Sequence, residues 1–341
     1  EFSFGVVCSR DGSFDRTASS MSLETARKAM ASWDLESASL RLVAQRENTV
    51  YQVTIEDGTN YALRLHRPGY QTPAALRSEL QWMEALLEGG LEVPTPIPTT
   101  ENLLLIAIDE YQIDLLSWLS GKPMGASGEA LQLQNRRETF RSLGQIMARV
   151  HSISDGWSRP QEFERVSWGR EGLVGENPVW GKFWENPHLS SAQRKLFGDI
   201  RSEAIEELRN VEETLDYGLI HADLVRENIL ISERGLQLID FDDSGFGFRL
   251  FEIATTLLRN TGEADSDELQ AALINGYRSI RPIDTAHLPL FMMLRALSYV
   301  GWIVPRMTEP GSDVRLRRFI NTAENLVRQY REANTRNSST A

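Results

Sequence analysis

The sequence contains a single cysteine, Cys8, among 341 residues. One cysteine excludes an internal disulfide and a zinc site built on several thiolates, so the composition favours a reducing compartment and we expect a cytoplasmic protein. A periplasmic protein without disulfides would have the same composition. Long apolar runs are also lacking: residues 288–304 are interrupted by Arg295 and are short for a bilayer crossing, so we expect a buried helix and no membrane partner.

A secretion signal is not evident either. Residues 1–20 are rich in Ser, Gly and Asp, do not begin with Met, and have no apolar run bounded by basic residues. We therefore interpret residues 1–20 as a poorly ordered tail or an expression remnant, with Met21 as a candidate natural start.

Basic side chains are fewer than acidic ones. The chain has 36 Lys and Arg against 48 Asp and Glu, a formal net charge of −12. Nucleic-acid binding requires clustered Lys and Arg, so we expect no nucleic-acid partner, whereas a cationic small-molecule substrate is compatible with the charge. With 41% hydrophobic and 25% charged residues, the chain suits one two-lobed enzyme or two small domains. Nothing in the sequence indicates an oligomeric state.

Residues 21–118 have the pattern of a small mixed sheet with one inserted helix. Alternating apolar residues predict strands near residues 40–42, 50–55, 61–65, 103–108 and 113–116. The alternation places Arg64 on the face opposite Leu63 and Leu65. A helix over residues 73–87 holds Glu79 within its apolar stripe, where a carboxylate must find a cation or hydrogen-bond donors.

Outside this sheet the pattern is mainly helical. Besides a first helix over residues 23–33, we expect helices over residues 131–151, 191–215, 250–258, 266–280, 288–304 and 314–333. We therefore predict an α+β fold of two lobes joined near residues 116–121, with an N-lobe of residues 21–118 and a C-lobe of residues 119–341.

A short hairpin is predicted to carry an amide and a carboxylate together. Two apolar segments, residues 229–231 and 236–239, flank a turn. If Ile231 pairs with Leu236, the antiparallel register sets Asn228 opposite Ile239, immediately beside Asp240. Hard oxygen donors placed in this way suit Mg²⁺, which takes few protein ligands and keeps water and phosphate oxygens.

A second carboxylate lies at the other end of the polar loop that precedes this hairpin. Asp223 is five residues before Asn228 and can accept the proton of a substrate hydroxyl. The spacing His-x-Asp-x-x-x-x-Asn, followed by a strand that ends in Asp, is typical of a kinase catalytic loop. This pattern predicts phosphoryl transfer from ATP.

These segments resemble the aminoglycoside phosphotransferase superfamily, which includes choline and ethanolamine kinases, type II homoserine kinases and a bacterial stress-response Ser/Thr kinase. The likeness rests on Gly-Leu-Ile-His-Ala-Asp at 218–223, Glu-Asn-Ile-Leu at 227–230 and Leu-Ile-Asp-Phe-Asp-Asp at 238–243. It covers nearly the whole chain after residue 21, and Arg295, Tyr299 and Trp302 resemble the stress-response and homoserine kinase branch. The resemblance implies a eukaryotic-protein-kinase-like fold, ATP and Mg²⁺ as cofactors, Asp223 as catalytic base, and Asn228 and Asp240 as metal ligands.

The resemblance also implies a nucleotide site in the N-lobe. Glu79 matches the helix glutamate of the family, and Arg64 occupies the strand position usually held by the lysine that contacts the ATP phosphates. Arginine keeps the charge but is not equivalent to lysine. Three further nucleotide-binding candidates are Asn48, Ser117 and Leu119.

Other departures from the family pattern concern single positions. Residues 45–50, at the place of the phosphate-covering loop, contain no glycine. Glu252 stands where the family has Asp, and we expect it to hold the catalytic loop through backbone N–H groups. The sequence Asp240-Phe241-Asp242 replaces the protein-kinase Asp-Phe-Gly, which favours the small-molecule branch.

Several other residues have two interpretations. We expect His221 and His151 to be structural hydrogen-bonding residues. Asp242 and Asp243 are candidates for a second metal contact or a cationic-substrate pocket. Four tryptophans are candidates for an aromatic amine site, although core packing is the more common role for such residues: Trp157, Trp168, Trp180 and Trp184.

We predict a kinase that phosphorylates a hydroxyl of a small molecule, such as an amino alcohol, an amino acid or an aminoglycoside-like compound. One alternative is a protein Ser/Thr kinase, although no activation segment ending in Ala-Pro-Glu follows Asp240. Another is a nucleotide-binding pseudokinase, which the arginine at position 64 suggests. No sequence feature identifies the phosphoryl acceptor.

Overall fold

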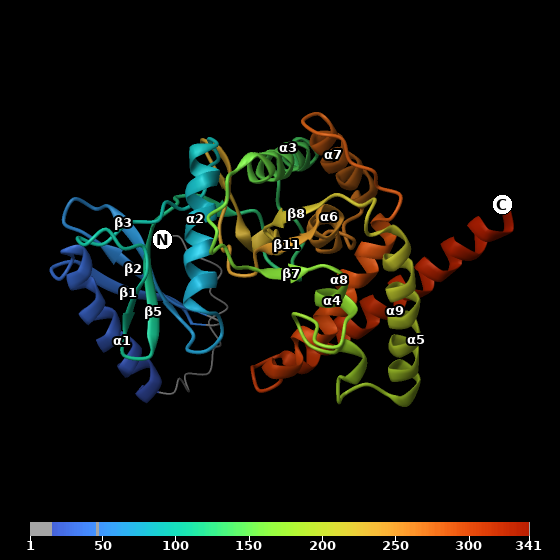
Figure 1. Ribbon diagram of the computed structural model, residues 1–341, viewed down its shortest axis with the longest axis horizontal. Coiled ribbons are helices and arrows are strands. Elements are labelled where there is room, and N and C mark those ends of the chain that lie inside the picture. Colours follow the sequence, from blue (N-terminus) through green and yellow to red (C-terminus); the bar gives the residue numbers. More distant parts are fainter. Residues whose placement is uncertain (1–15, 46–47, 341) are drawn as a thin grey trace. The chain divides into compact units, whose positions relative to one another are not determined.

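The computed structural model describes residues 16–45 and 48–340, with the side chains of residues 21–45 and 48–335 (Figure 1). Residues 1–15 of the predicted tail lie outside the described part, as do residues 46 and 47 of the predicted phosphate-covering loop. Residues 16–20, also assigned to the tail, instead begin helix α1 (Arg16–Met30). A 3₁₀ turn, η1 (Ala31–Trp33), extends this helix to the predicted end.

The chain forms two compact units, and each is built from several segments. The first comprises residues up to 133 together with 156–165 and 226–242, and the second comprises residues 134–155, 166–225 and 243 onward. The first unit therefore includes the 229–238 hairpin, which the sequence assigned to the second lobe. A reason is that the two-residue strand β6 (Lys122–Pro123) pairs with this hairpin. The lobe limits at residues 118 and 119 remain a prediction.

A five-stranded antiparallel sheet forms the base of the first unit, where the sequence predicted a mixed sheet. Its order is β1-β2-β3-β5-β4. The strands are β1 (Ser39–Gln45), β2 (Asn48–Thr54), β3 (Asn60–His66), β4 (Ile106–Ile108) and β5 (Tyr111–Ser117). Every neighbouring pair in this sheet is antiparallel. Strands β1 to β3 form a meander, β4 and β5 form a hairpin, and β3 pairs with β5.

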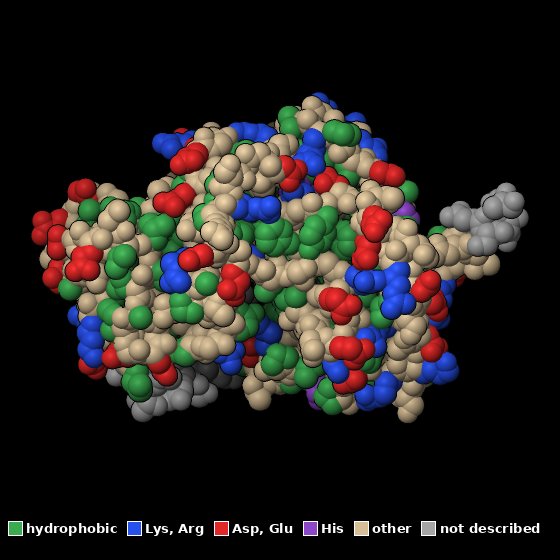
Figure 2. Space-filling view, in the orientation of Figure 1, with side chains coloured by type: hydrophobic (Ala, Val, Ile, Leu, Met, Phe, Trp, Pro, Cys, Tyr) green, Lys and Arg blue, Asp and Glu red, His purple; other side chains and the backbone are tan. Residues whose placement is uncertain are grey.

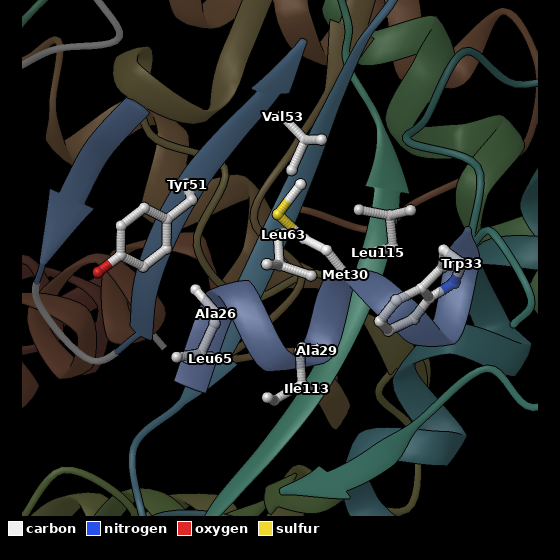
Figure 3. Close-up of a cluster of buried hydrophobic side chains, with 10 residues drawn as sticks. All are labelled: Ala26, Ala29, Met30, Trp33, Tyr51, Val53, Leu63, Leu65, Ile113 and Leu115. Atoms are coloured by element: carbon white, nitrogen blue, oxygen red, sulfur yellow. The ribbon is translucent and has the colours of Figure 1, made fainter. Parts of the chain in front are cut away.

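Helix α1 covers one face of this sheet with Ala26, Ala29 and Met30 (Figure 3). Ala26 and Ala29 are fully buried and let the helix approach Leu63 and Leu65 on β3. Successive strand residues point to opposite faces. Arg64 therefore points to the other face, toward helix α2 (Pro73–Glu88), as the alternation predicted.

The second sheet of the first unit contains the predicted hairpin. Strands β9 (Ile229–Ser232) and β10 (Gly235–Leu238) pair in the order β10-β9-β6. Ile231 pairs with Leu236, which confirms the predicted register. At Gly121, just before β6, a Cβ atom would lie 2.6 Å from that of Leu230, so only glycine allows this approach.

The second unit is mainly helical around a small sheet of order β7-β11-β8 (Figure 1). The strands are β7 (Val166–Trp168), β8 (Tyr217–Ile220) and β11 (Gly245–Phe248). The helices are α3 (Arg136–Gly156), α4 (Arg170–Val174), α5 (Ser191–Val211), α6 (Arg249–Leu258), α7 (Ser266–Arg278), α8 (Leu288–Trp302) and α9 (Ser312–Thr340), with shorter 3₁₀ turns η2 (Phe183–Glu185), η3 (Arg226–Asn228, in the first unit) and η4 (Val304–Arg306).

Helix α6 is buried on all sides, and α8 is buried over nearly its whole length, which agrees with the prediction of a buried helix at residues 288–304. Within the described residues, no helix has the length and apolar character needed to cross a membrane. Acidic and basic side chains are interspersed on the face that Figure 2 shows.

Candidate active site

The hairpin brings the backbone positions of Asn228 and Asp240 close together. The N–H of Ile239 donates to the carbonyl oxygen of Asn228 at 3.0 Å, so the ladder continues one pair beyond the strands. Asp240 follows directly and is exposed, whereas Asn228 is 7% exposed. Asn228 and Asp240 therefore occupy neighbouring backbone positions at the open end of one hairpin. These oxygen donors fit a small hard cation such as Mg²⁺.

Two residues near the predicted catalytic positions have left-handed backbone conformations. Ala222 has φ 65° and Asp240 has φ 66°, and neither is glycine. Such conformations are costly for residues with a Cβ and persist where the surroundings impose them. Ala222 directly precedes Asp223, and Asp240 directly follows the hairpin, so both conformations set the direction of a carboxylate.

In the second unit, Asp223 contacts Arg295, which interrupts an apolar stretch in the sequence and was not among the predicted site residues. Nη2 of Arg295 on α8 donates to Oδ1 of Asp223 at 2.8 Å. The side chain of Asp223 is 22% exposed and that of Arg295 is 0% exposed. His221 is buried, and its Nδ1 accepts the N–H of Asp223 at 3.4 Å, consistent with the expected structural role.

Glu252 holds the loop around Ala222, as predicted. Its Oε2 accepts the N–H of Ala222 at 2.7 Å, and its Oε1 contacts Nε2 of His151 at 2.9 Å. Nδ1 of His151 contacts the hydroxyl of Tyr277 at 2.7 Å, which confirms the expected buried and hydrogen-bonded role of His151. The loop is thereby tied to helices α3, α6 and α7. Burial lowers the pKa of His151 well below its usual value, so this ring is neutral.

Burial raises the pKa of Glu252 to about 7, although the N–H of Ala222 and the charge of Arg249 act in the opposite direction. An unfolded glutamate releases its proton near pH ~4.3, so between these values the folded state binds more protons than the unfolded state. The stability of the protein is therefore expected to fall as pH rises through this window.

Glu252→Gln should remove this pH dependence, because glutamine imitates the protonated side chain and can keep both contacts. We expect the variant to match the wild type near pH ~5 and to exceed its unfolding free energy by about 2–3 kcal/mol near pH ~8. Urea unfolding of both proteins across this range measures the difference. A difference that stays constant with pH would show that Glu252 is ionised throughout.

Arg64 is enclosed by two carboxylates in the first unit. Its Nε and Nη2 donate to the two oxygens of Asp114 at 2.8 and 2.7 Å, and its Nη1 donates to Glu79 at 2.8 Å. The predicted pairing of Arg64 with Glu79 is confirmed. All three side chains are at most 8% exposed. Every nitrogen of the guanidinium thus donates to a carboxylate oxygen, an arrangement that we call a clamp. Contact of Arg64 with a nucleotide phosphate stays a prediction.

Asp114 and His66 complete this cluster and were not among the predicted site residues. Nε2 of His66 lies 2.7 Å from Oδ2 of Asp114. Although burial acts to raise it, the pKa of Asp114 is held at about 2 by Arg64 and His66. Asp114 lies opposite Arg64 in the β3–β5 register. A carboxylate within an apolar strand was the available signal in the sequence.

The other predicted nucleotide-binding residues lie on the same five-stranded sheet or directly after it. Oδ1 of Asn48 contacts Nδ1 of His66 at 3.1 Å, so its side chain belongs to the edge of the Arg64 cluster. Ser117 ends β5 and its Oγ accepts the N–H of Thr95 at 2.8 Å. Leu119 is partly buried two residues later. Their contact with a nucleotide stays a prediction.

Asp242 and Asp243 each contact a neighbouring side chain, and a metal or substrate contact at these residues stays a prediction. Gln71 donates to Oδ1 of Asp242 at 2.7 Å, and burial together with the charge of Glu79 raises the pKa of Asp242. Oδ1 of Asp243 accepts the indole N–H of Trp180 at 3.2 Å. Of the four candidate tryptophans, Trp168, Trp180 and Trp184 are buried, as core packing predicts.

The family model described as the phosphotransferase enzyme family matches residues 39–289, about three quarters of the chain. The chain belongs to the phosphotransferase enzyme family. The family assignment confirms the resemblance drawn from the 218–243 segment. This phosphotransferase is therefore a kinase-type enzyme that uses an alcohol group as acceptor.

Individual relatives support the same assignment. The phosphotransferase is 26% identical over 290 residues to the amicoumacin kinase of Bacillus subtilis, covering 80% of this chain and 82% of that protein. A microcompartment-associated aminopropanol kinase has the same fold, with TM-score 0.78 and 28% identity over 91% of this chain and 98% of that one. An amicoumacin kinase bound to AMP-PNP, Ca²⁺ and Ami has TM-score 0.68 and 21% identity over 92% and 94% of the two chains. The predicted protein-kinase-like α+β fold is confirmed.

Proposed function

We propose that this phosphotransferase transfers the γ-phosphoryl group of MgATP to a hydroxyl of a small amine-bearing alcohol, with Asp223 as base and Asn228 and Asp240 as metal ligands. The observation that carries the proposal is the hairpin register, which sets Asn228 opposite Ile239 and beside the exposed Asp240. Asp223 is five residues before Asn228 in the sequence. The acceptor class is suggested by the aminopropanol kinase of the same fold.

The reaction needs little covalent chemistry from the protein. The acceptor oxygen forms a bond to the γ-phosphorus, the bond from that phosphorus to the β-bridging oxygen breaks, and ADP leaves. Asp223 takes the hydroxyl proton, and its partial exposure leaves the carboxylate within reach of an acceptor. Asn228 and Asp240 would hold Mg²⁺, which neutralises phosphate charge when bound. Glu252 holds the backbone of the loop that carries Asp223, because it accepts the N–H of Ala222.

The test is ADP release from MgATP in the presence of single acceptors. We expect turnover with aminopropanol or a related amino alcohol, measured beside ethanolamine, choline, homoserine and amicoumacin. Chelation of divalent cations should stop the reaction and added Mg²⁺ should restore it. Phosphate incorporation into the protein itself or into casein, without turnover of any acceptor, would favour the Ser/Thr kinase alternative. Thermal stabilisation by MgATP without turnover would favour the pseudokinase.

A further inference from the structure

Arg295 lies in an enclosure of aromatic rings beside the proposed base. Its guanidinium carbon is 4.1 Å from the ring centre of Trp180, 4.6 Å from that of Tyr299 and 5.2 Å from that of Phe251. Nη2 donates both to Oδ1 of Asp223 at 2.8 Å and to the hydroxyl of Tyr299 at 3.0 Å. The rings come from three separate segments of the second unit, so the arginine is held from several directions.

Burying a charged guanidinium in this enclosure lowers the stability of the fold, so packing alone does not explain it. Arg295 is fully buried, and its Nε and Nη1 have no hydrogen-bond partner among the described residues. Contact with aromatic faces offsets only part of the lost hydration of a guanidinium. An apolar side chain of similar length would fill the enclosure without this cost. The charge is therefore explained by the carboxylate that it contacts, which is Asp223.

We propose that Arg295 is a positioning residue for phosphoryl transfer, which orients the Asp223 carboxylate. The inference rests on the proposed role of Asp223 as base. Asp223 lies in a loop, whereas Arg295 lies in the buried helix α8. The hydrogen bond from Arg295 therefore anchors the carboxylate to a rigid element. Stacking of Tyr299 on Phe319, with ring centres 5.1 Å apart, ties α8 to α9 and stabilises the enclosure. Trp180 thus contacts a cation of the protein itself.

Arg295→Met tests the inference, because methionine fills the enclosure but carries no charge. We expect kcat for the best acceptor to fall about 10- to 100-fold, with the KM for MgATP changed by less than about twofold. Arg295→Lys keeps a cation without the planar fork and should recover about a tenth or more of the wild-type rate.

A matched control is Arg201→Met, because Arg201 also stacks on a tryptophan, Trp184, at 4.0 Å and pairs with the carboxylate of Glu176. The control should keep its kcat.

A double-mutant cycle with Asp223→Asn separates positioning from general damage. If Arg295 acts through Asp223, Arg295→Met should not lower further the residual rate of Asp223→Asn. An equal loss in both backgrounds would overturn the inference, as would an unchanged kcat in Arg295→Met while Asp223→Asn is slow. If Asp223→Asn itself is fully active, the proposed function fails rather than this inference alone.

A crystal structure of Arg295→Met supplies a measurement that does not depend on an acceptor. The inference predicts that the Asp223 carboxylate leaves its wild-type position or occupies several positions, while the backbone of residues 221–224 stays in place because Glu252 holds Ala222. An Asp223 side chain that keeps a single unchanged position would contradict the inference.

Discussion

Replacing Asp223 by asparagine is expected to lower kcat by about 10²- to 10⁴-fold, the range for loss of a general base. Asparagine has nearly the same shape, so Arg295 and the loop held by Glu252 should keep their places. The affinity for MgATP should change by less than about twofold, because Asp223 is proposed to contact the acceptor and not the nucleotide. Steady-state kinetics and calorimetric titration of MgATP measure the two quantities.

The control for this variant is Asp199→Asn. Asp199 is another aspartate of the second unit that pairs with a cation, Lys195, but both side chains are about half exposed or more. An exposed pair contributes little, so this variant should match the wild type in rate and stability. If Asp223→Asn keeps kcat within about threefold of the wild type, positioning alone accounts for the chemistry and no base acts at this residue.

The second large effect is expected at Arg64. Arg64→Met should lower the free energy of unfolding by about 3–5 kcal/mol, since two buried carboxylates, Glu79 and Asp114, lose their shared cation. Arg64→Lys restores the lysine that the family usually has, yet it should still cost about 1–3 kcal/mol, because one ammonium cannot satisfy both oxygens of Asp114 and also Glu79. Urea unfolding measures both losses.

A compensating variant tests whether Arg64 and Asp114 stabilise the first unit through their mutual contact. In Arg64→Lys/Asp114→Asn the side chain at position 114 is neutral, and we expect at least about half of the stability lost in Arg64→Lys to return. Arg41→Met is the control, because Arg41 also bonds twice to one side chain of the sheet, Gln52, but is exposed. Additive losses from the two substitutions would mean that Arg64 and Asp114 act independently.

The parts of the site that sequence could predict depend on regular periodicities. The alternation in β3 put Arg64 opposite Leu63 and Leu65, and the helical spacing in α2 turned Glu79 inward, so their pairing followed. The register of Ile231 with Leu236 followed from the two short apolar runs and the turn between them. From that register alone, Asn228 and Asp240 became neighbours.

The remaining contacts join segments that no periodicity relates. The sequence does not reveal the partner of Asp114, because its contact with Arg64 depends on the pairing of β5 with β3. Strand β6 has two residues, Lys122 and Pro123, too few for any pattern. Strand β11 contains Gly245 and Gly247, where close approach of the neighbouring strands requires glycine, and these residues do not suggest a strand in sequence.

Arg295 was the most informative signal that periodicity did not explain. In sequence it interrupts an apolar stretch, and that interruption argued only against a membrane span. An arginine is seldom fully buried without a partner, so its place in a buried helix implies a carboxylate from elsewhere in the chain. The identity of this carboxylate depends on how α8 packs in the second unit. In the structure Arg295 contacts Asp223.

The most direct test of the central claim is ³¹P NMR of the products formed from MgATP and aminopropanol. Phosphoryl transfer to the hydroxyl predicts equal amounts of ADP and of a phosphomonoester resonance that disappears on treatment with alkaline phosphatase, with the signal greatly reduced for Asp223→Asn. If the only new resonances are those of ADP and inorganic phosphate, with this acceptor and with the related amino alcohols, the phosphoryl group goes to water and the claim is contradicted.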